Sequence, residues 1–396
     1  MSETNAKAAT QVVRAGLGAD KQFNAVVAPI YLSTTYGFNG LEGRGQFDYS
    51  RSGNPTRQQL INALVGLEGG AGGDATSTGM GAAGALAHRV LRQGDLVFAP
   101  HDCYGGTWRL FTALADSGFI EVAFIDLSAA DAQALIAARH PKLVWVETPS
   151  NPLLRITDIA AVTEAAHAVN AVVAVDNTFM SPILQRPLDF GVDYVVYSTT
   201  KYISGHSDVV GGAIIAATVE DAEQVHWWCN TLGVTASPFD SYLTMRGLRT
   251  MAARMALHNS NAEKLVAAVS GHPAIKALYW PGLVSHPGHE LAAKQQRSFG
   301  AMLSIDVGSF AAATTLCAAL KLFTLAESLG GVESLICSPA TMTHAAMPAA
   351  VQAAAGITPG LLRLSIGIED SADLIADLGA GLDQVVACGN RAACLG

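Results

Sequence analysis

The sequence contains, at residues 193–206, the run Asp193-Tyr194-Val195-Val196-Tyr197-Ser198-Thr199-Thr200-Lys201-Tyr202-Ile203-Ser204-Gly205-His206. Its first half is apolar and β-branched, which predicts a buried strand, and its second half turns abruptly polar. Lys201 therefore follows the end of a buried strand, which is where open α/β sheets bind their ligands. We expect the surrounding chain to supply such a sheet.

The residues around Lys201 favour a chemical role for its amine. A lysine held half-buried can have a lowered pKa, which makes the amine a nucleophile and a base. Ser198 and Thr200 alternate along an extended chain and can point at one anion beside the lysine. The alternative is a lysine whose apolar stem is covered while its amine reaches solvent. The flanking hydroxyls favour a pocket that holds a phosphate next to an amine-reactive carbon.

Strand and helix patterns alternate on both sides of this run. Strands are predicted at 96–99, 121–125, 143–146, 171–175 and 212–216, and helices at 57–68, 106–117, 131–139 and 158–169. This alternation predicts an α/β fold with a mainly parallel sheet covered on both faces. We expect residues 1–60 to form an arm that contacts a neighbouring subunit, 61–255 a large domain, and 256–396 a smaller α+β domain with strands at 301–307 and 361–366.

Composition excludes several classes of protein. Half of the 396 residues are hydrophobic, 14% are charged and the net charge is -9, so we expect a large core and no nucleic-acid partner. No apolar run has the length of a membrane span, and Met1–Gln11 has no signal-peptide core. The cysteines form no CxxC pair, which indicates free thiols in a reducing cytoplasm and no metal site. They are Cys103, Cys229, Cys317, Cys337, Cys388 and Cys394.

A second candidate anion site lies at residues 75–84. Hydroxyls and glycines, Gly79 among them, precede a helix of small residues that we expect to run to about Arg92, and free N–H groups at a helix start bind anions. Gly79-x-Gly81-x-x-Gly84 also matches a dinucleotide fingerprint, which is the alternative. The residues before it are small and polar, so the apolar first strand that this fingerprint requires is missing. A phosphate cup is the better interpretation.

Polar residues also follow the other predicted strands. Asp176 ends the apolar run 171–175, and either caps a helix or pairs with a cation. Beside Lys201, a buried carboxylate could keep the ring nitrogen of a pyridine cofactor protonated. Asn151 follows the strand that ends at Glu147 and can donate a hydrogen bond. Tyr104 follows another strand and could stack on a flat ring, although core packing also explains a tyrosine.

Arg363 lies in an apolar run near the C-terminus, Leu361–Gly367. A buried arginine needs an anion, and its planar fork fits a carboxylate. A structural ion pair is the competing explanation for this residue.

Together these stretches resemble the Cys/Met-metabolism family of pyridoxal-phosphate enzymes, over nearly the whole chain. The blocks that carry the resemblance include Tyr49–Thr56, Ser77–Met80, Tyr104–Thr107, Glu147–Pro152, Val175–Thr178, Ser198–His206 and Glu327–Ser334. The resemblance implies the aspartate-aminotransferase-like fold, also called fold type I, with pyridoxal 5′-phosphate as the cofactor. It also implies a homotetramer built from two dimers that share their active sites.

The resemblance assigns a role to each candidate residue. Lys201 would bind the cofactor as a Schiff base and then move protons, Asp176 would pair with the ring nitrogen, and Tyr104 would stack on the ring. The phosphate would be held by Gly79, Met80, Ser198 and Thr200, and by Tyr49 and Arg51 from the neighbouring subunit. The α-carboxylate of the substrate would be bound by Arg363, Asn151 and Ser328.

Within the family, the chain most resembles the γ-synthase branch, through His101–Gly106, Trp227-Trp228, Pro238–Leu243 and Ala340–Ala345. This implies that the thiol of cysteine replaces the succinyl group of O-succinylhomoserine, or of another O-acylhomoserine, to give cystathionine and succinate. Arg109 is our candidate for a distal carboxylate, against a solvated helix arginine. Asp48 and Glu327 are candidates for an amino group.

Three positions separate the alternatives within the family. An acid at Glu327 argues against the β-lyases, which carry an aromatic residue there, and Gly106 argues against the methionine γ-lyases, which carry a cysteine. Ser52 departs from the γ-synthases, which often have a second arginine there, and agrees with the γ-lyases. Cleavage of cystathionine to cysteine, 2-oxobutanoate and ammonia is therefore the alternative activity. A protein of this fold kept only for binding or regulation is disfavoured because Lys201 and Asp176 are both present.

Overall fold

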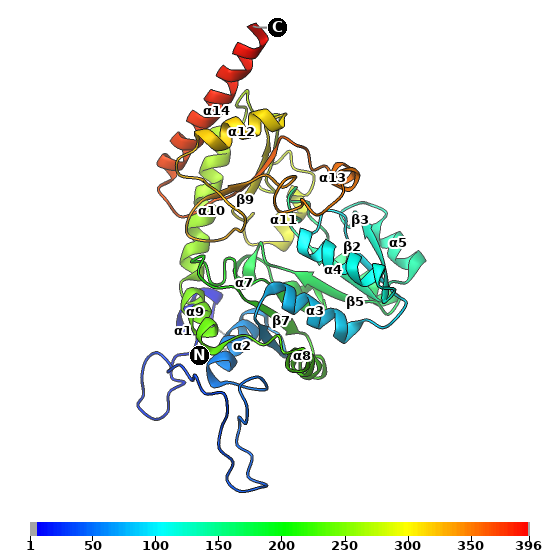
Figure 1. The fold of residues 1–396 in the computed structure, drawn as a ribbon, viewed down its shortest axis with the longest axis vertical. Coiled ribbons are helices and arrows are strands. Elements are labelled where there is room, and N and C mark those ends of the chain that lie inside the picture. Colours follow the sequence, from blue (N-terminus) through cyan, green and yellow to red (C-terminus); the bar gives the residue numbers. More distant parts are fainter. Residues whose placement is uncertain (1–5, 395–396) are drawn as a thin grey trace.

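The computed structural model describes the backbone of residues 6–394, and the side chains up to residue 389. Two sheets lie along the chain's long axis in Figure 1, with helices around each of them. The N-terminal segment loops away from the body at one end of this axis, and helix α14 projects at the other.

The first sheet is mostly parallel, as the alternation of strands and helices predicted. Its order is β1-β7-β6-β5-β4-β2-β3, and β1 and β7 are the antiparallel members. The strands are β1 Gly72–Thr76, β2 Asp95–Pro100, β3 Ile120–Ile125, β4 Leu143–Glu147, β5 Val172–Asp176, β6 Tyr194–Tyr197 and β7 Gly212–Ala216. The run that includes Lys201 therefore forms a central strand, β6, followed by its polar segment.

Helices cover both faces of this sheet because alternate strand residues point to opposite sides. On one face, Val173, Val175 and Val195 pack with α2 (Pro55–Glu68), α5 (Ala132–Arg139) and α6 (Ile159–Ala168). On the other face, Ala174 and Val196 pack with α3 (Gly79–Val90), α4 (Gly105–Asp116) and α8 (Val219–Leu232). The carboxyl ends of the parallel strands are left open between these layers.

One strand of this sheet was not predicted from the sequence. The small and polar residues before Gly79 form β1, which pairs along its whole length with β7. Its sequence is Gly-Gly-Asp-Ala-Thr, and a Cβ at Gly73 would clash with the backbone of Ile214. The close approach of β7 therefore favours glycine over a β-branched residue here. As an antiparallel edge strand, β1 still differs from the parallel first strand of a dinucleotide fold.

The second sheet has the order β10-β11-β12-β9-β8. Its strands are β8 Ala277–Tyr279, β9 Met302–Asp306, β10 Thr324–Leu325, β11 Leu335–Cys337 and β12 Leu361–Ser365. The helices that accompany it are α11 His289–Gln295, α12 Phe310–Ala319, α13 Ala349–Ala355 and α14 Ser371–Cys394. The short strands β8, β10 and β11 were not predicted, because two or three residues give too little periodicity.

Helix α10 (Met251–Val269) joins the two sheets. Its first half contributes Met251 and Met255 to the core of the first sheet, and its second half contributes Leu265 and Val266 to the core of the second. The remaining helical segments are α7 Ser181–Leu184, the 3-10 turn Pro187–Phe190 and α9 Pro238–Leu248.

Residues 6–54 contain one helix, α1 (Ala8–Arg14), and otherwise run as extended or irregular chain. Large apolar side chains on this arm are exposed, among them Phe23, Val26, Leu32, Phe38 and Leu41. An exposed apolar surface of this kind is typical of a subunit interface.

Within the described residues, no helix combines the length and apolar character needed to cross a membrane. Five of the cysteines are free thiols, namely Cys103, Cys229, Cys317, Cys337 and Cys388. The side chain of Cys394 and residues 1–5 of the expected polar N-terminus lie outside the described part.

Candidate active site

A cavity of about 320 Å³ lies at the carboxyl ends of β4, β5 and β6, between the two sheets. It is lined by most of the residues that the sequence singled out: Gly79, Met80, Tyr104, Asn151, Asp176, Ser198, Thr200, Lys201, Glu327, Ser328 and Arg363. Topology explains this convergence, since parallel strands end at one edge of the sheet. The cavity also includes Thr78, Glu147, Thr178 and Thr343, which the sequence analysis did not assign.

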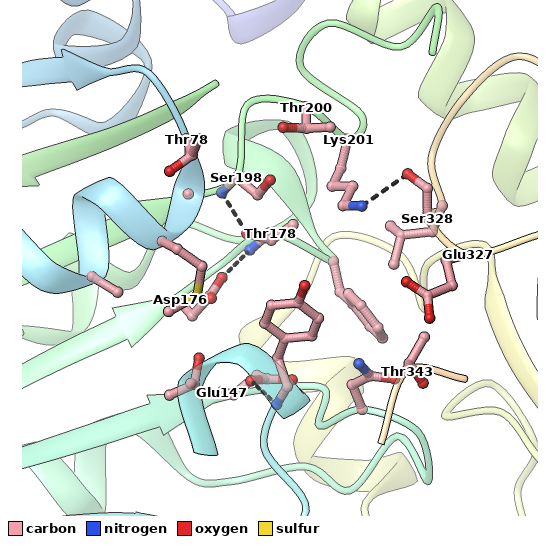
Figure 2. A pocket seen from close by; sticks show the side chains of 18 of the residues that line it. Thr78, Glu147, Asp176, Thr178, Ser198, Thr200, Lys201, Glu327, Ser328 and Thr343 are labelled. Atoms are coloured by element: carbon pink, nitrogen blue, oxygen red, sulfur yellow. Dashed lines mark hydrogen bonds between the residues drawn. The ribbon is translucent and has the colours of Figure 1, made fainter. Parts of the chain in front are cut away.

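Lys201 points into the cavity, and its Nζ donates a 2.8 Å hydrogen bond to Ser328 Oγ (Figure 2). Burial, and after it the nearby Arg363 guanidinium, lowers the pKa of Lys201 to about 8, while the Glu327 carboxylate acts in the opposite direction. A substantial fraction of the amine is therefore neutral near pH 8, which is the form that acts as nucleophile and base.

Asp176 lies across the cavity from Lys201, at the end of β5 (Figure 2). Its Oδ1 accepts a 3.0 Å hydrogen bond from the backbone N–H of Thr178. Burial raises the pKa of Asp176, and the hydrogen bonds from Thr178 oppose the rise. A buried carboxylate in this position is stabilised when a cationic group binds against it.

The candidate anion cup is formed by the start of α3 and the end of β6. Thr78 is the N-cap of α3 and accepts a 2.7 Å hydrogen bond from the N–H of Gly81. The N–H groups of Gly79 and Met80 precede the first intrahelical donors and are available to an anion. A Cβ at Gly79 would lie 2.9 Å from Ser198 Cβ, so the close approach of the two loops requires glycine.

Arg363 is buried on β12, and its two terminal nitrogens bind Asn151 Oδ1 and the Ser328 carbonyl oxygen, each at 2.9 Å. Among the described side chains, no carboxylate forms an ion pair with it, which removes the alternative of a structural ion pair. Its guanidinium is instead held by neutral groups at the cavity wall. This arrangement fits the binding of a carboxylate from solution.

Tyr104 is placed by a residue that the sequence analysis left without a role. Glu147, buried at the end of β4, accepts a 2.9 Å hydrogen bond from the Tyr104 N–H, just before α4 begins. A Cβ at Gly106 would clash with the Tyr104 ring and with Met80 Sδ. The absence of a side chain at Gly106 is therefore part of how the ring is positioned over the cavity.

Four of the expected site residues do not line the cavity. Arg109 is exposed on α4, although its charge reaches Tyr104 and lowers the pKa of that phenol against a larger rise from burial. Asp48, Tyr49 and Arg51 lie on the arm. Asp48 accepts a 2.6 Å hydrogen bond from Ser52 Oγ and pairs with Arg44 at 2.9 Å. The arm residues are thus separate from the cavity of their own chain.

The sequence profile described as "Cys/Met metabolism PLP-dependent enzyme" matches residues 9–383. The chain belongs to this family.

Individual relatives within the family are close in sequence and in structure. Cystathionine gamma-synthase of Escherichia coli is 53% identical, over 95% of this chain and 97% of that protein. A crystal structure of cystathionine gamma synthase from Xanthomonas oryzae, in complex with aminoacrylate and cysteine, matches with a TM-score of 0.95 and 56% identity, over 96% of this chain and 99% of that one. Cystathionine gamma-lyase of Bacillus subtilis is 42% identical, over 96% of this chain and all of that protein.

The cavity fits the family's cofactor, pyridoxal phosphate. The glycine-lined start of α3 offers N–H groups for a phosphate, and a buried carboxylate and a low-pKa lysine face each other across the space between. The expected fold, fold type I with a mainly parallel sheet, is confirmed by the solved relatives.

Proposed function

We propose that this enzyme replaces the γ-substituent of O-succinyl-L-homoserine, or of another O-acylhomoserine, with the thiol of L-cysteine, as a cystathionine γ-synthase does. The carbon–oxygen bond at Cγ breaks, the acyl group leaves as a carboxylate such as succinate, and a carbon–sulfur bond forms. The thiol proton is released, and the product is L-cystathionine. The proposal is supported by identities of 53% and 56% to two cystathionine γ-synthases.

The chain's own residues divide this work among them. Bound pyridoxal phosphate supplies an electron sink for charge that develops at Cα. Arg363, with Asn151 and Ser328 beside it, binds the α-carboxylate of the substrate. The Lys201 amine would take the proton from Cα and then move protons at the neighbouring carbon. With the cofactor bound, Asp176 would hold a proton on its ring nitrogen, and Tyr104 would stack on its ring.

The single observation that carries the γ-replacement is the position of Glu327. It lines the same cavity as Lys201 and Arg363, and Figure 2 shows it on the opposite side from Asp176. A reaction between two amino acids needs a place for the second ammonium group, beyond the one that reacts. Glu327 is an exposed acid at the cavity wall, with no ion-pair partner among the residues that the structure describes, and it can supply this place.

The alternative function is cleavage of cystathionine, and one observation favours it. Ser52 stands where γ-synthases often have a second arginine, and its Oγ bonds Asp48 instead of presenting a cation. Relatives described as cystathionine gamma-lyases are 42% and 43% identical to the chain.

A paired assay on the purified holoenzyme distinguishes the two functions. One sample contains O-succinylhomoserine and cysteine and is measured for cystathionine. The other contains cystathionine alone and is measured for 2-oxobutanoate, pyruvate and free cysteine. We expect fast synthesis and slow breakdown. Fast release of 2-oxobutanoate with little synthesis would make the enzyme a γ-lyase, and pyruvate as the main product would contradict the role of Glu327.

We further propose that the enzyme is a cytoplasmic homotetramer of two dimers, divided into an arm (1–60), a large domain (61–255) and a C-terminal domain (256–396). The exposed apolar residues of the arm support a subunit contact. In each dimer, Tyr49 and Arg51 would reach the phosphate of the neighbouring subunit, and Asp48 would lie near its substrate.

A further inference from the structure

Outside the cavity, a charged cluster centred on a buried carboxylate lies where the arm meets the first sheet. Asp74, on the edge strand β1, is fully buried. His226 Nδ1, from α8, lies 2.9 Å from Asp74 Oδ2, and Arg57 Nε, from α2, lies 3.9 Å from Asp74 Oδ1. We call Asp74, His226 and Arg57 the Asp74 cluster. A buried carboxylate destabilises a fold unless it is paired, so removal of a partner of Asp74 should disturb the elements that meet here.

The cluster and α8 hold two consecutive residues of the arm. Arg57 donates a 2.9 Å hydrogen bond to the carbonyl oxygen of Arg51. Asn230, one helical turn after His226, accepts a 3.0 Å hydrogen bond from Arg51 Nε. His226 also bonds the backbone of Ser52. Helix α8, which is distant in sequence, and the first turns of α2 therefore converge on Arg51 and Ser52.

This point of attachment lies between two functional regions. Strand β1 runs from Asp74 to its end at Thr76, and the chain then continues to Thr78 and Gly79, the start of the anion cup in the same chain. On the other side, the Arg51 guanidinium lies over the Tyr49 ring, 5.7 Å from its centre, and Tyr49 is 48% exposed. Arg51 is thus held at its backbone by Arg57 and at its Nε by Asn230, while the exposed ring of Tyr49 lies beside its guanidinium.

We propose that His226, held by Asp74, is a positioning residue that fixes Arg51 and Ser52 of the arm for binding the cofactor phosphate of the neighbouring subunit. This inference rests on the proposed role of Arg51 in that subunit. Neither His226 nor Asp74 touches the cavity of its own chain, so the effect is transmitted through the arm.

The charge of His226 makes this attachment dependent on pH. The groups that act on it are Asp74 from β1, Arg57 from α2 and the backbone of Ser52 from the arm, while the thiol of Cys229 on α8 faces the same Asp74 and Arg57. The hydrogen bond to Asp74 raises the pKa of His226, while burial and the Arg57 charge oppose the rise. Burial raises the pKa of Cys229, so its thiol is neutral. A raised histidine pKa means that the attachment is complete at low pH and weakens as pH rises through that pKa.

Hydrogen exchange on the holoenzyme tests the positioning directly. The N–H groups of Ser50 and Gly53 donate to Thr34 and Tyr49 within the arm, so exchange over 49–53 reports its attachment. We expect His226→Ala to speed exchange in this segment about tenfold at pH 6.5, through local opening. His226→Gln, which keeps a hydrogen-bonding side chain without the charge, should give protection factors between those of wild type and His226→Ala. After correction for intrinsic base-catalysed exchange, it should also lose the change in protection between pH 6.5 and pH 9 that wild type shows.

His167→Ala is the matched control. His167 lies 3.0 Å from Asp193 and is about as exposed as His226 (43% against 47%), but Asp193 is partly exposed where Asp74 is buried, and the pair lies on α6 and just before β6, apart from the helices that hold the arm. We expect it to leave exchange over 49–53 unchanged. Equal exchange in His226→Ala and wild type, or equal changes in the two alanine variants, would overturn the proposal.

Cofactor retention tests the consequence for the neighbouring phosphate. During dialysis, followed by visible absorbance, we expect His226→Ala to lose pyridoxal phosphate about tenfold faster than wild type, as for a lost charge-assisted contact. A loosened arm with unchanged retention would also overturn the proposal. Neither hydrogen exchange nor cofactor retention depends on turnover. Failure of the paired assay would therefore reject the proposed reaction without deciding whether His226 positions the arm.

Discussion

At the scale of single residues, the cavity places two buried carboxyl groups side by side. Glu147 and Asp176 are register partners on the adjacent strands β4 and β5. Burial, and then the charge of Asp176, raises the pKa of Glu147 well above its usual range. We infer that Glu147 is the neutral member of the pair, which leaves Asp176 to carry the charge at this edge of the sheet.

Substitution of Glu147 tests this assignment. Glu147→Gln keeps an oxygen that can accept from the Tyr104 N–H and should retain the near-native circular dichroism of the bound cofactor. Glu147→Ala leaves that N–H unpaired and should destabilise the protein by about 1–3 kcal/mol in urea unfolding. It should also weaken the cofactor signal, because Tyr104 loses its anchor.

The same pair of variants predicts a pH dependence. Because the folded state holds the Glu147 proton to a higher pH than the unfolded chain, this group's contribution to stability falls as pH rises above about 4.3. Glutamine has no such proton to lose. The stability of Glu147→Gln relative to wild type should therefore increase from pH 5 to pH 8. A relative stability that decreases over this range would show that Glu147 is ionised in the fold.

Arg109 gives a prediction about substrate rather than cofactor. Its side chain is exposed on α4 and acts on Tyr104 through its charge. Arg109→Ala should raise KM for O-succinylhomoserine by about three- to tenfold with little change in kcat, as expected when a binding contact is lost. Arg139→Ala, on the exposed surface of α5, is the control. An unchanged KM would remove Arg109 from the substrate site.

The sequence revealed some site residues more readily than others. Lys201 and Asp176 each follow an apolar run, so the position of a strand end predicts where they lie. Glu147 follows the same pattern, but its partner is a backbone N–H 43 residues earlier in the chain. That contact depends on where α4 packs, which no local pattern contains.

At the scale of elements, the strand β1 shows where local propensity fails. Its glycines and aspartate disfavour a strand in isolation, and it forms because β7 offers a complete set of backbone partners. The longer strands were predicted to within one or two residues, since buried parallel strands are continuous apolar runs.

Helix α3 offers a prediction with its own control. Gly79→Ala would force a Cβ against Ser198 and disturb the anion cup. We expect it to weaken pyridoxal phosphate binding by at least tenfold, about 1.4 kcal/mol, measured by equilibrium dialysis. Gly84→Ala lies in the same helix, where nothing is within 4 Å of the added carbon. It should leave cofactor binding unchanged and stabilise the helix by up to about 1 kcal/mol. Equal effects of the two substitutions on cofactor binding would contradict the role of Gly79 in the anion cup.

At the scale of the whole molecule, the contacts within one chain do not explain the exposed surface of the arm. It exposes large apolar residues, and it presents Tyr49 and Arg51 away from the cavity of its own chain. Sequence could predict that the arm lacks a core, because it lacks periodic apolar residues. It could not predict what covers the arm, since that surface belongs to another molecule.

A hybrid oligomer tests whether the arm completes a neighbour's site. We expect Lys201→Ala alone to abolish turnover while the fold is retained, and Arg51→Ala alone to lower activity strongly. If Arg51 acts in the partner subunit, a random mixture of the two variants contains intact sites, each with Lys201 from one chain and Arg51 from the other. In closed two-fold dimers, these make up about a quarter of all sites.

Co-expression of the two variants should therefore restore about a quarter of wild-type activity per site, well above either variant alone. If Arg51 serves the cavity of its own chain, every site in the mixture lacks one of the two residues and no activity returns. Activity that returns without subunit exchange, when the separately folded variants are only mixed, would point to a contaminating enzyme. The outcome decides whether the smallest functional unit is one chain or two.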